Sequence, residues 1–300
     1  MKEVVVISGK GGTGKTSITA ALANLWDRPV IADCDVDAAD LHLLLDPDIK
    51  KRYPFISGIE PVLDKDICTE CGQCREVCVY DAIDDGYSIN RLNCEGCGVC
   101  FHFCPVQAIQ LQDRECGEWY VSDTRFGSMV HARLGIAEEN SGKLVTLIRK
   151  KARSIAEVKQ KDVVLIDGSP GIGCPVISSI TGASLVVLVT EPTVSGIHDM
   201  KRVFGLAAHF KVPVLVVINK ADLDLQMAQQ IISSCRENKI KIAGQIPYDP
   251  VFTRAMVQGQ TVFEYDGGKK CPVCENIQSI SDQIQNRLLV SEMNEEIMEG

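Results

Sequence analysis

Short apolar runs recur along the chain, and sequence with helical periodicity follows most of them. The runs cover residues 4–8, 30–33, 163–166, 185–190 and 214–219. Apolar runs that do not alternate with polar residues are typical of strands buried on both faces of a parallel sheet. Strands that alternate with helices predict an α/β fold with a mainly parallel sheet and helices on both faces.

The same pattern bears on where the protein resides. The longest apolar runs, 185–189 and 212–218, are far shorter than the ~20 residues that a membrane-spanning helix needs. The run at 4–7 is too short for a signal peptide, which predicts a cytoplasmic protein. A net charge of −9 and an acidic tail at 291–300 argue against nucleic-acid binding and against stable binding to anionic membranes.

A glycine-rich loop follows the first apolar run, and a helical pattern over 17–26 comes next. A G-x-x-x-x-G-K-[ST] loop between a strand and a helix binds phosphate through its backbone N–H groups and the helix N-terminus. Lys15 is expected to contact the β- and γ-phosphates, and Thr16 the Mg²⁺ ion. The expected nucleotide-binding residues of this loop are Gly9, Lys10, Gly11, Gly12, Thr13, Gly14, Lys15, Thr16 and Ser17.

Eight of the 14 cysteines form two runs with the same spacing. The first run is Cys68, Cys71, Cys74 and Cys78, and the second is Cys94, Cys97, Cys100 and Cys104. In two-cluster ferredoxins the first three cysteines of a run bind one [4Fe–4S] cluster and the fourth binds the other cluster. One cluster is therefore assigned to Cys68, Cys71, Cys74 and Cys104, and the second to Cys94, Cys97, Cys100 and Cys78.

Residues 64–113, which contain both runs, hold nine acidic and three basic residues and so carry a net charge of 3 − 9 = −6. The segment resembles the bacterial-type two-cluster ferredoxins over about 50 residues, except that Val79 replaces the proline expected after Cys78. Structural zinc is the alternative, but zinc sites do not use an interleaved three-plus-one pattern.

The phosphate loop carries a second lysine, Lys10, directly after its first glycine. This form resembles the deviant Walker A loop of the MinD, ParA, Mrp and nitrogenase-iron-protein superfamily of ATPases. The resemblance implies that Lys10 reaches the nucleotide of a partner subunit. It also implies that Asp35 orients the attacking water and the Mg²⁺ shell, a role that Asp33 or Asp37 could share. Asp167, after the run at 163–166, resembles the Walker B aspartate and would hold Mg²⁺ through water.

The segment Asn219-Lys220-Ala221-Asp222 matches the N-K-x-D signature of GTPases. In the MinD-type superfamily an asparagine at this strand end reads adenine instead. Pro247 and Asp249, in a Pro-Tyr-Asp-Pro segment, resemble the residues that flank the base. The resemblance therefore favours ATP over GTP.

These patterns predict three parts of the chain. Residues 1–60 and 116–290 form a P-loop ATPase domain, 61–115 an inserted α+β two-cluster ferredoxin domain, and 291–300 an acidic tail. The whole arrangement resembles the ferredoxin-containing branch of the MinD-type ATPases.

Six cysteines remain outside the two runs. Cys271 and Cys274 form a C-P-x-C motif that resembles Mrp-type cluster carriers, in which two cysteines from each subunit hold one [4Fe–4S] cluster. Half of a zinc site and free thiols are the alternatives. Cys174 lies seven residues after Asp167, near the position of the cluster cysteine of the nitrogenase iron protein, although a small buried cysteine is the preferred interpretation.

The leading hypothesis is an ATPase, active as a homodimer or as a heterodimer with a paralogous ATPase. ATP would be coupled to electron transfer through two [4Fe–4S] clusters to an acceptor metalloprotein. One alternative is an iron–sulfur scaffold or carrier of the Mrp type. The other is a MinD-like positioning ATPase with a redox sensor.

Overall fold

The computed structural model describes every residue except 136–137, 139–140, 266–271 and 300, and it leaves the side chains of 291–299 undescribed. The chain divides into two units. The larger unit comprises Met1–Arg52, Trp119–Arg133 and Ser141–Gly300, and the smaller unit comprises Tyr53–Glu118 and Leu134–Asn140. Among the described residues, no helix combines the length and the apolar character needed to cross a membrane.

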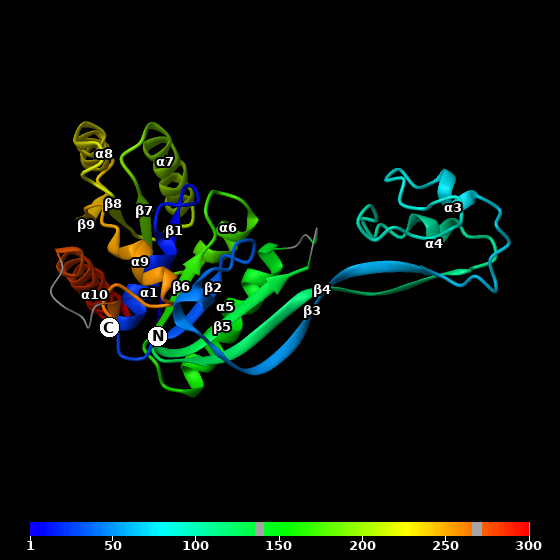
Figure 1. The fold of residues 1–300 in the computed structure, drawn as a ribbon, viewed down its shortest axis with the longest axis horizontal. Helices are drawn as coiled ribbons and strands as arrows, with labels where there is room; N and C mark the ends of the chain where they lie inside the picture. Colours follow the sequence, from blue (N-terminus) through cyan, green and yellow to red (C-terminus); the bar gives the residue numbers. More distant parts are fainter. Residues whose placement is uncertain (136–137, 139–140, 266–271, 300) are drawn as a thin grey trace. The chain divides into compact units, whose positions relative to one another are not determined.

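A nine-stranded sheet runs in the order β3-β4-β5-β2-β6-β1-β7-β8-β9 (Figure 1). The strands are β1 (Lys2–Ser8), β2 (Val30–Cys34), β3 (Asp48–Leu63), β4 (Ile109–Thr124), β5 (Gly127–Leu134), β6 (Val163–Gly168), β7 (Leu185–Thr190), β8 (Val214–Asn219) and β9 (Lys241–Ile246). From β5 to β9 each neighbouring pair is parallel. This agrees with the expected α/β fold and its mainly parallel sheet.

Helices follow the strands of the larger unit. They are α1 (Lys15–Leu25), α2 (Leu41–Leu45), α5 (Ser141–Val158), α6 (Cys174–Ile180), α7 (Val194–His209), α8 (Leu225–Glu237), α9 (Val251–Val257) and α10 (Pro272–Glu299). Helix α1 begins at Lys15, two residues before the expected start, so the end of the phosphate loop is also the first turn of the helix.

The central strands are apolar throughout because both of their faces are covered. Val4 and Val6 of β1 belong to one core with Ile18 of α1 and Ile280 of α10, and α1 contacts α10 (Figure 1). Val5, on the opposite face of β1, is equally buried. Burial on both faces explains why the runs did not alternate.

Strands β3, β4 and β5 were not expected from the sequence. β3 and β4 are 16 residues long, and polar residues interrupt both of them. Their segments nearest the cysteines belong to the smaller unit, which also holds α3 (Gln73–Glu76) and α4 (Val99–Phe103). Ile83 and Ile109 form the centre of its small core together with Cys74 and Cys100.

The two halves of the smaller unit repeat one backbone geometry. Glu70 and Gly96 both have a positive φ, and so do Gly72 and Gly98, the N-cap residues directly before α3 and α4. The repeated cysteine spacing of residues 68–78 and 94–104 is therefore accompanied by a repeated backbone geometry in the two loops that carry these cysteines.

Candidate functional site

The carboxyl ends of β1, β2, β6 and β8 meet at one edge of the sheet because these strands run parallel. A cavity of about 360 Å³ lies there. This is where ligands bind in open parallel sheets. Its lining includes Ser8, Gly11, Gly12, Thr13, Gly14, Lys15, Thr16, Ser17, Asp35, Leu44, Asn219, Lys220, Pro247, Tyr248, Asp249, Phe252 and Met256.

The backbone of the phosphate loop requires glycine at position 14. Gly14 has a φ of +87°, and a Cβ atom there would lie 2.4 Å from Nδ2 of Asn219. That amide donates a hydrogen bond to the carbonyl oxygen of Thr13 at 2.7 Å. The asparagine therefore supports the loop as well as facing the cavity.

Lys15 is the buried cation of this site. Its Nζ lies 2.9 Å from Oδ1 of Asp167 and 3.2 Å from Oδ2 of Asp35. Burial alone would lower the pKa of Lys15, but these carboxylates raise it above its usual value. Thr16 donates from Oγ1 to Oδ2 of Asp167 at 2.8 Å. The structure therefore brings together the residues from three segments that the sequence assigned to phosphate and Mg²⁺.

The carboxylates of this site can accept a divalent cation. Oδ2 of Asp33 and Oδ1 of Asp35 are buried and lack hydrogen-bond partners in the described part of the chain. Burial, with Asp167 close by, raises the pKa of Asp33 well above its usual value. Carboxylate oxygens are hard ligands that suit Mg²⁺, so the donor set fits this ion. Of these aspartates only Asp35 lines the cavity; Asp33 and Asp167 are almost fully buried, and Asp37 is exposed and lies outside the lining.

Lys10 does not point at the carboxylates around Lys15. It forms an ion pair of 2.5 Å with Glu191, which directly follows β7, and its Nζ lies 3.2 Å from Oγ of Ser195. Glu191 was not predicted from the sequence, although its position after a buried strand offered a signal. Neither Lys10 nor Glu191 is among the residues that line the cavity, whereas Lys220, Phe252 and Met256 line it without having been expected.

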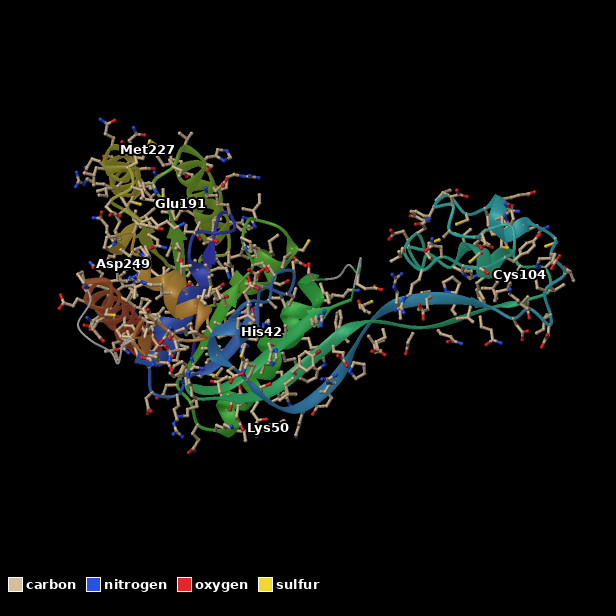
Figure 2. All side chains as sticks on the ribbon, in the orientation of Figure 1. His42, Lys50, Cys104, Glu191, Met227 and Asp249 are labelled. Atoms are coloured by element: carbon tan, nitrogen blue, oxygen red, sulfur yellow. The ribbon has the colours of Figure 1, made fainter. Side chains whose placement is uncertain are left out.

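The smaller unit contains two small cavities, and each is lined by four cysteines. One is lined by Cys68, Cys71, Cys74 and Cys104, and the other by Cys78, Cys94, Cys97 and Cys100. These are the two interleaved sets that the spacing predicted. Figure 2 shows sulfur atoms gathered near the labelled Cys104. The donor set fits two cubane clusters, which are held by four thiolates each.

Backbone N–H groups point at several of these sulfur atoms. Ala82 donates to Sγ of Cys78 at 3.4 Å, and Ala108 donates to Sγ of Cys104 at 3.2 Å, at matching positions of the repeat. Such hydrogen bonds to thiolate sulfur tune the reduction potential of a bound cluster. Within the described residues, no group of three or more His, Cys, Asp or Glu side chains could hold a single metal ion. A cubane differs from such a site because each of its irons takes one cysteine.

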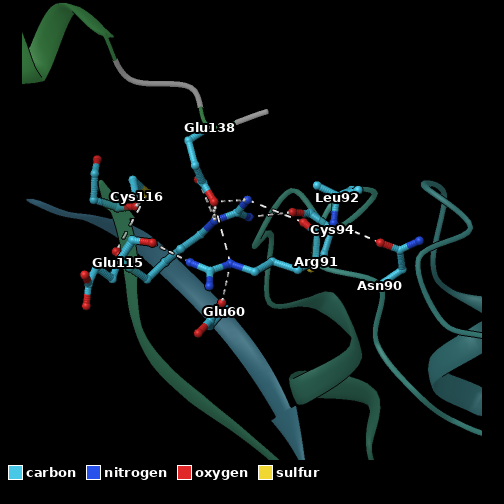
Figure 3. A network of polar contacts seen from close by, with 10 residues as sticks. Glu60, Asn90, Arg91, Leu92, Cys94, Glu115, Cys116 and Glu138 are labelled. Carbon is cyan, nitrogen blue, oxygen red and sulfur yellow. Dashed lines mark hydrogen bonds and ion pairs between the residues drawn. The ribbon is translucent and has the colours of Figure 1, made fainter. Parts of the chain in front are cut away.

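An arginine–carboxylate network borders the second set of cysteines (Figure 3). Arg114 donates to the carbonyl oxygen of Cys94 at 2.7 Å and to both carboxylate oxygens of Glu138. Arg91 lies 3.2 Å from Glu60 and 3.6 Å from Glu138. This network could not be predicted from the sequence, because its members are up to 78 residues apart in the chain. It fixes the loop that begins the second set.

Three cysteines outside the two runs, Cys174, Cys271 and Cys274, were also considered as cluster ligands. Cys174 is exposed, so the expectation that it is a small buried residue is wrong; it begins α6, at the surface. Cys274 is buried, and its thiol donates to the carbonyl oxygen of Val262 at 3.6 Å. Cys271 lies outside the described residues, so a cluster shared by Cys271 and Cys274 stays a prediction.

Comparison with known proteins identifies the family. The model of the CobQ/CobB/MinD/ParA nucleotide binding domain matches residues 4–262, and the chain belongs to this family. The chain is 37% identical over 225 residues to the uncharacterized protein MJ0578 of Methanocaldococcus jannaschii. The aligned region covers 74% of this chain and 79% of that protein.

Two further similarities were found, one over nearly the whole chain and one over a short stretch. The fold is similar to the septum site-determining protein MinD complexed with Mg-ADP from Pyrococcus horikoshii, with a TM-score of 0.57, 17% identity and coverage of 94% and 95% of the two chains. A stretch of 53 residues is 42% identical to the pyruvate synthase subunit PorD of Methanothermobacter marburgensis; it covers 18% of this chain and 65% of that protein.

Proposed function

We propose that this protein is an Mg²⁺-dependent ATPase that couples ATP binding and hydrolysis to electron transfer through two [4Fe–4S] clusters to a partner metalloprotein. One observation carries the proposal. A single chain combines a phosphate-loop cavity with two cavities whose cysteines follow the interleaved three-plus-one arrangement. A plain nucleotide switch has no need of eight cysteines in that order.

The nucleotide site would work through five residues. Lys15 would neutralise the β- and γ-phosphates, and Thr16 and Asp167, already in contact with each other, would hold Mg²⁺. Asp35 would orient the attacking water. Lys10 would reach the nucleotide of a second subunit, in a homodimer or in a heterodimer with a paralogous ATPase. The MinD relative whose fold this chain shares is described with Mg-ADP, which supports a purine nucleotide with Mg²⁺.

The position of Asp222 supports ATP rather than GTP. In the N-K-x-D signature the aspartate reads guanine, but Asp222 does not line the cavity, whereas Asn219, Pro247 and Asp249 do. Oδ1 of Asp222 instead accepts the backbone N–H of Tyr248 at 2.5 Å. The carboxylate therefore holds the base-flanking segment in place.

Replacing Asp222 with asparagine is expected to leave the ratio of kcat/KM for ATP and GTP within about twofold of the wild-type ratio. A carboxylate that read guanine would change this ratio by orders of magnitude, because its loss leaves buried polar groups unpaired. Steady-state hydrolysis of both nucleotides measures the ratio. A large loss confined to GTP would assign guanine to this site.

The clusters would supply one-electron carriers in the smaller unit, and eight cysteines of this chain would hold them. The pyruvate synthase subunit that resembles part of this chain belongs, by its name, to an enzyme that carries out a redox synthesis, and the short likeness does not extend that activity to this protein. ATP can shift a redox equilibrium only through different affinities for two states of the protein.

A stopped-flow experiment tests the proposal. Reduced protein is mixed anaerobically with benzyl viologen, a one-electron acceptor, in the presence of MgATP, MgADP or no nucleotide. MgATP is expected to change the rate of cluster oxidation at least about fivefold, which corresponds to about 1 kcal/mol of coupling. Equal rates under the three conditions would contradict the proposed coupling.

The likeness to MinD favours a second candidate, a positioning ATPase in which the cysteine-rich unit senses redox state. Co-sedimentation with liposomes of anionic lipid would support that candidate. The third candidate, an iron–sulfur carrier, depends on Cys271 and Cys274. It requires a labile cluster that is absent after Cys271→Ser and that transfers to an acceptor protein.

A further inference from the structure

Glu191 connects two lysines, Lys10 of the phosphate loop and Lys220, which lines the nucleotide cavity. Its Oε1 lies 2.5 Å from Nζ of Lys10, and its Oε2 lies 3.2 Å from Nζ of Lys220. Lys220 also donates to the carbonyl oxygen of Gly12 at 3.0 Å. The series Lys10–Glu191–Lys220–Gly12 thus begins and ends on the phosphate loop, and Glu191 is its only anion.

The backbone around Glu191 is held in one conformation. The N–H of Thr193 donates to the carbonyl oxygen of Glu191 at 2.8 Å. A Cβ atom at Gly196 would lie 2.2 Å from that same oxygen, so glycine allows the first turn of α7 to close onto it. Thr193 caps α7 by accepting the N–H of Gly196 at 2.9 Å. The carboxylate therefore projects from a fixed point.

Glu191 is charged at neutral pH. Its side chain is 14% exposed, and burial alone would raise its pKa, but hydrogen bonds from Lys10 and Lys220 lower the pKa below the usual value. Lys10 is more exposed, at 33%. An ion pair between one fixed, largely buried carboxylate and one flexible, accessible lysine can break by movement of the lysine alone.

We infer that Glu191 competes for Lys10 with the nucleotide phosphates of a second copy of this chain, and thereby sets the protein concentration at which nucleotide drives pairing. The inference rests on the proposed function, in which Lys10 acts across a dimer. Lys10 must leave Glu191 before it can reach a phosphate of the second copy. Two such ion pairs must break when one symmetric dimer forms. The contribution to the free energy of dimerisation is therefore twice that of a single Lys10–Glu191 pair.

The substitution Glu191→Gln tests this competition in the full chain. The amide keeps the shape and one acceptor but removes the charge. With MgATPγS, the dimer dissociation constant measured by analytical ultracentrifugation is expected to fall about three- to tenfold, because each partly exposed ion pair is worth up to about a factor of five. With MgADP the variant and the wild type are expected to agree.

Glu264→Gln is the matched control. Glu264 also forms a partly buried ion pair, but its partner, Arg125, is not a residue of the phosphate loop. This variant is expected to dimerise as the wild type does. Glu191→Asp, which keeps the charge on a shorter side chain, is expected to lie between the wild type and Glu191→Gln, and it serves if the amide variant is unstable.

A second variant, Lys220→Met, distinguishes an effect of Glu191 on Lys10 from an effect on Lys220. If Glu191 acts by holding Lys10, Glu191→Gln is expected to tighten the dimer equally in a Lys220→Met protein. Loss of the effect in that background, or weaker dimerisation of Glu191→Gln, would overturn the inference. If the wild type dimerises with MgATPγS and Glu191→Gln has the same dimer dissociation constant, only this inference is overturned. If both proteins remain monomeric with MgATPγS, this inference and the proposed dimer are both overturned.

Discussion

ATP hydrolysis is expected to fall by at least about 100-fold when Lys15 is replaced by alanine. Removal of one preorganised charged donor from a transferring phosphoryl group has an effect of this size. In this protein the loss also leaves Asp35 and Asp167 facing each other without the cation that lies 3.2 Å and 2.9 Å from them. Phosphate release under saturating MgATP measures the rate.

The same variant tests the coupling. Lys15→Ala is expected to abolish the effect of MgATP on viologen reduction while leaving the rate without nucleotide unchanged. Because removal of a buried partner can destabilise a protein by about 3–5 kcal/mol, thermal unfolding must be followed in parallel. Lys15→Arg keeps the charge and serves as the second variant. A fully folded Lys15→Ala protein that still responds to MgATP would contradict the account.

Replacing Cys100 with serine is expected to lower the iron content from about eight to about four atoms per chain. Cys100 lines only the cavity that it shares with Cys78, Cys94 and Cys97. Burial, the largest cause, raises the pKa of Cys100 to about 11, so the free thiol keeps its proton at neutral pH and cluster binding must displace it. Anaerobic iron and sulfide analysis measures the loss.

Cys235 provides the matched control. It is buried in α8, far along the chain from both runs, and burial raises the pKa of its thiol to about 11 as well. Cys235→Ser is expected to retain about eight iron atoms per chain. Equal iron loss in the two variants would show that the effect of Cys100→Ser comes from general destabilisation, and it would remove the support for the assigned cysteine sets.

Two further variants test which cysteines belong to which cluster. Because the fourth cysteine of each run lies with the opposite set, Cys104→Ser is expected to affect the cluster of Cys68, Cys71 and Cys74. The paired variant, Cys78→Ser, should affect the other one. Spectra of the two variants that show loss of the same cluster would contradict the interleaved assignment.

Local sequence was sufficient for the features whose chemistry depends on spacing. The phosphate loop needs glycine where φ is positive, as at Gly14, and a lysine and a threonine at the start of a helix. Apolar runs predicted the parallel strands because residues buried on both faces leave no alternation. The carboxylates of Asp35 and Asp167 could be placed near Lys15 because parallel strands end at one edge of the sheet.

Features that depend on distant contacts were missed. The sequence does not show that β3 and β4 form long strands, because their residues alternate irregularly with charged ones. Arg114 and Glu138 are ordinary charged residues until the fold brings them together beside Cys94. The ion pair of Lys10 with Glu191 likewise joins residues 181 positions apart.

The most direct test of the central claim is an EPR-monitored redox titration of the anaerobically purified protein, with and without MgATP. The account predicts two [4Fe–4S] signals and a nucleotide-dependent shift of at least one potential. A coupling of 1–3 kcal/mol corresponds to a shift of about 40–130 mV for one electron. Two signals with potentials that do not respond to MgATP would contradict coupling between the nucleotide site and the clusters.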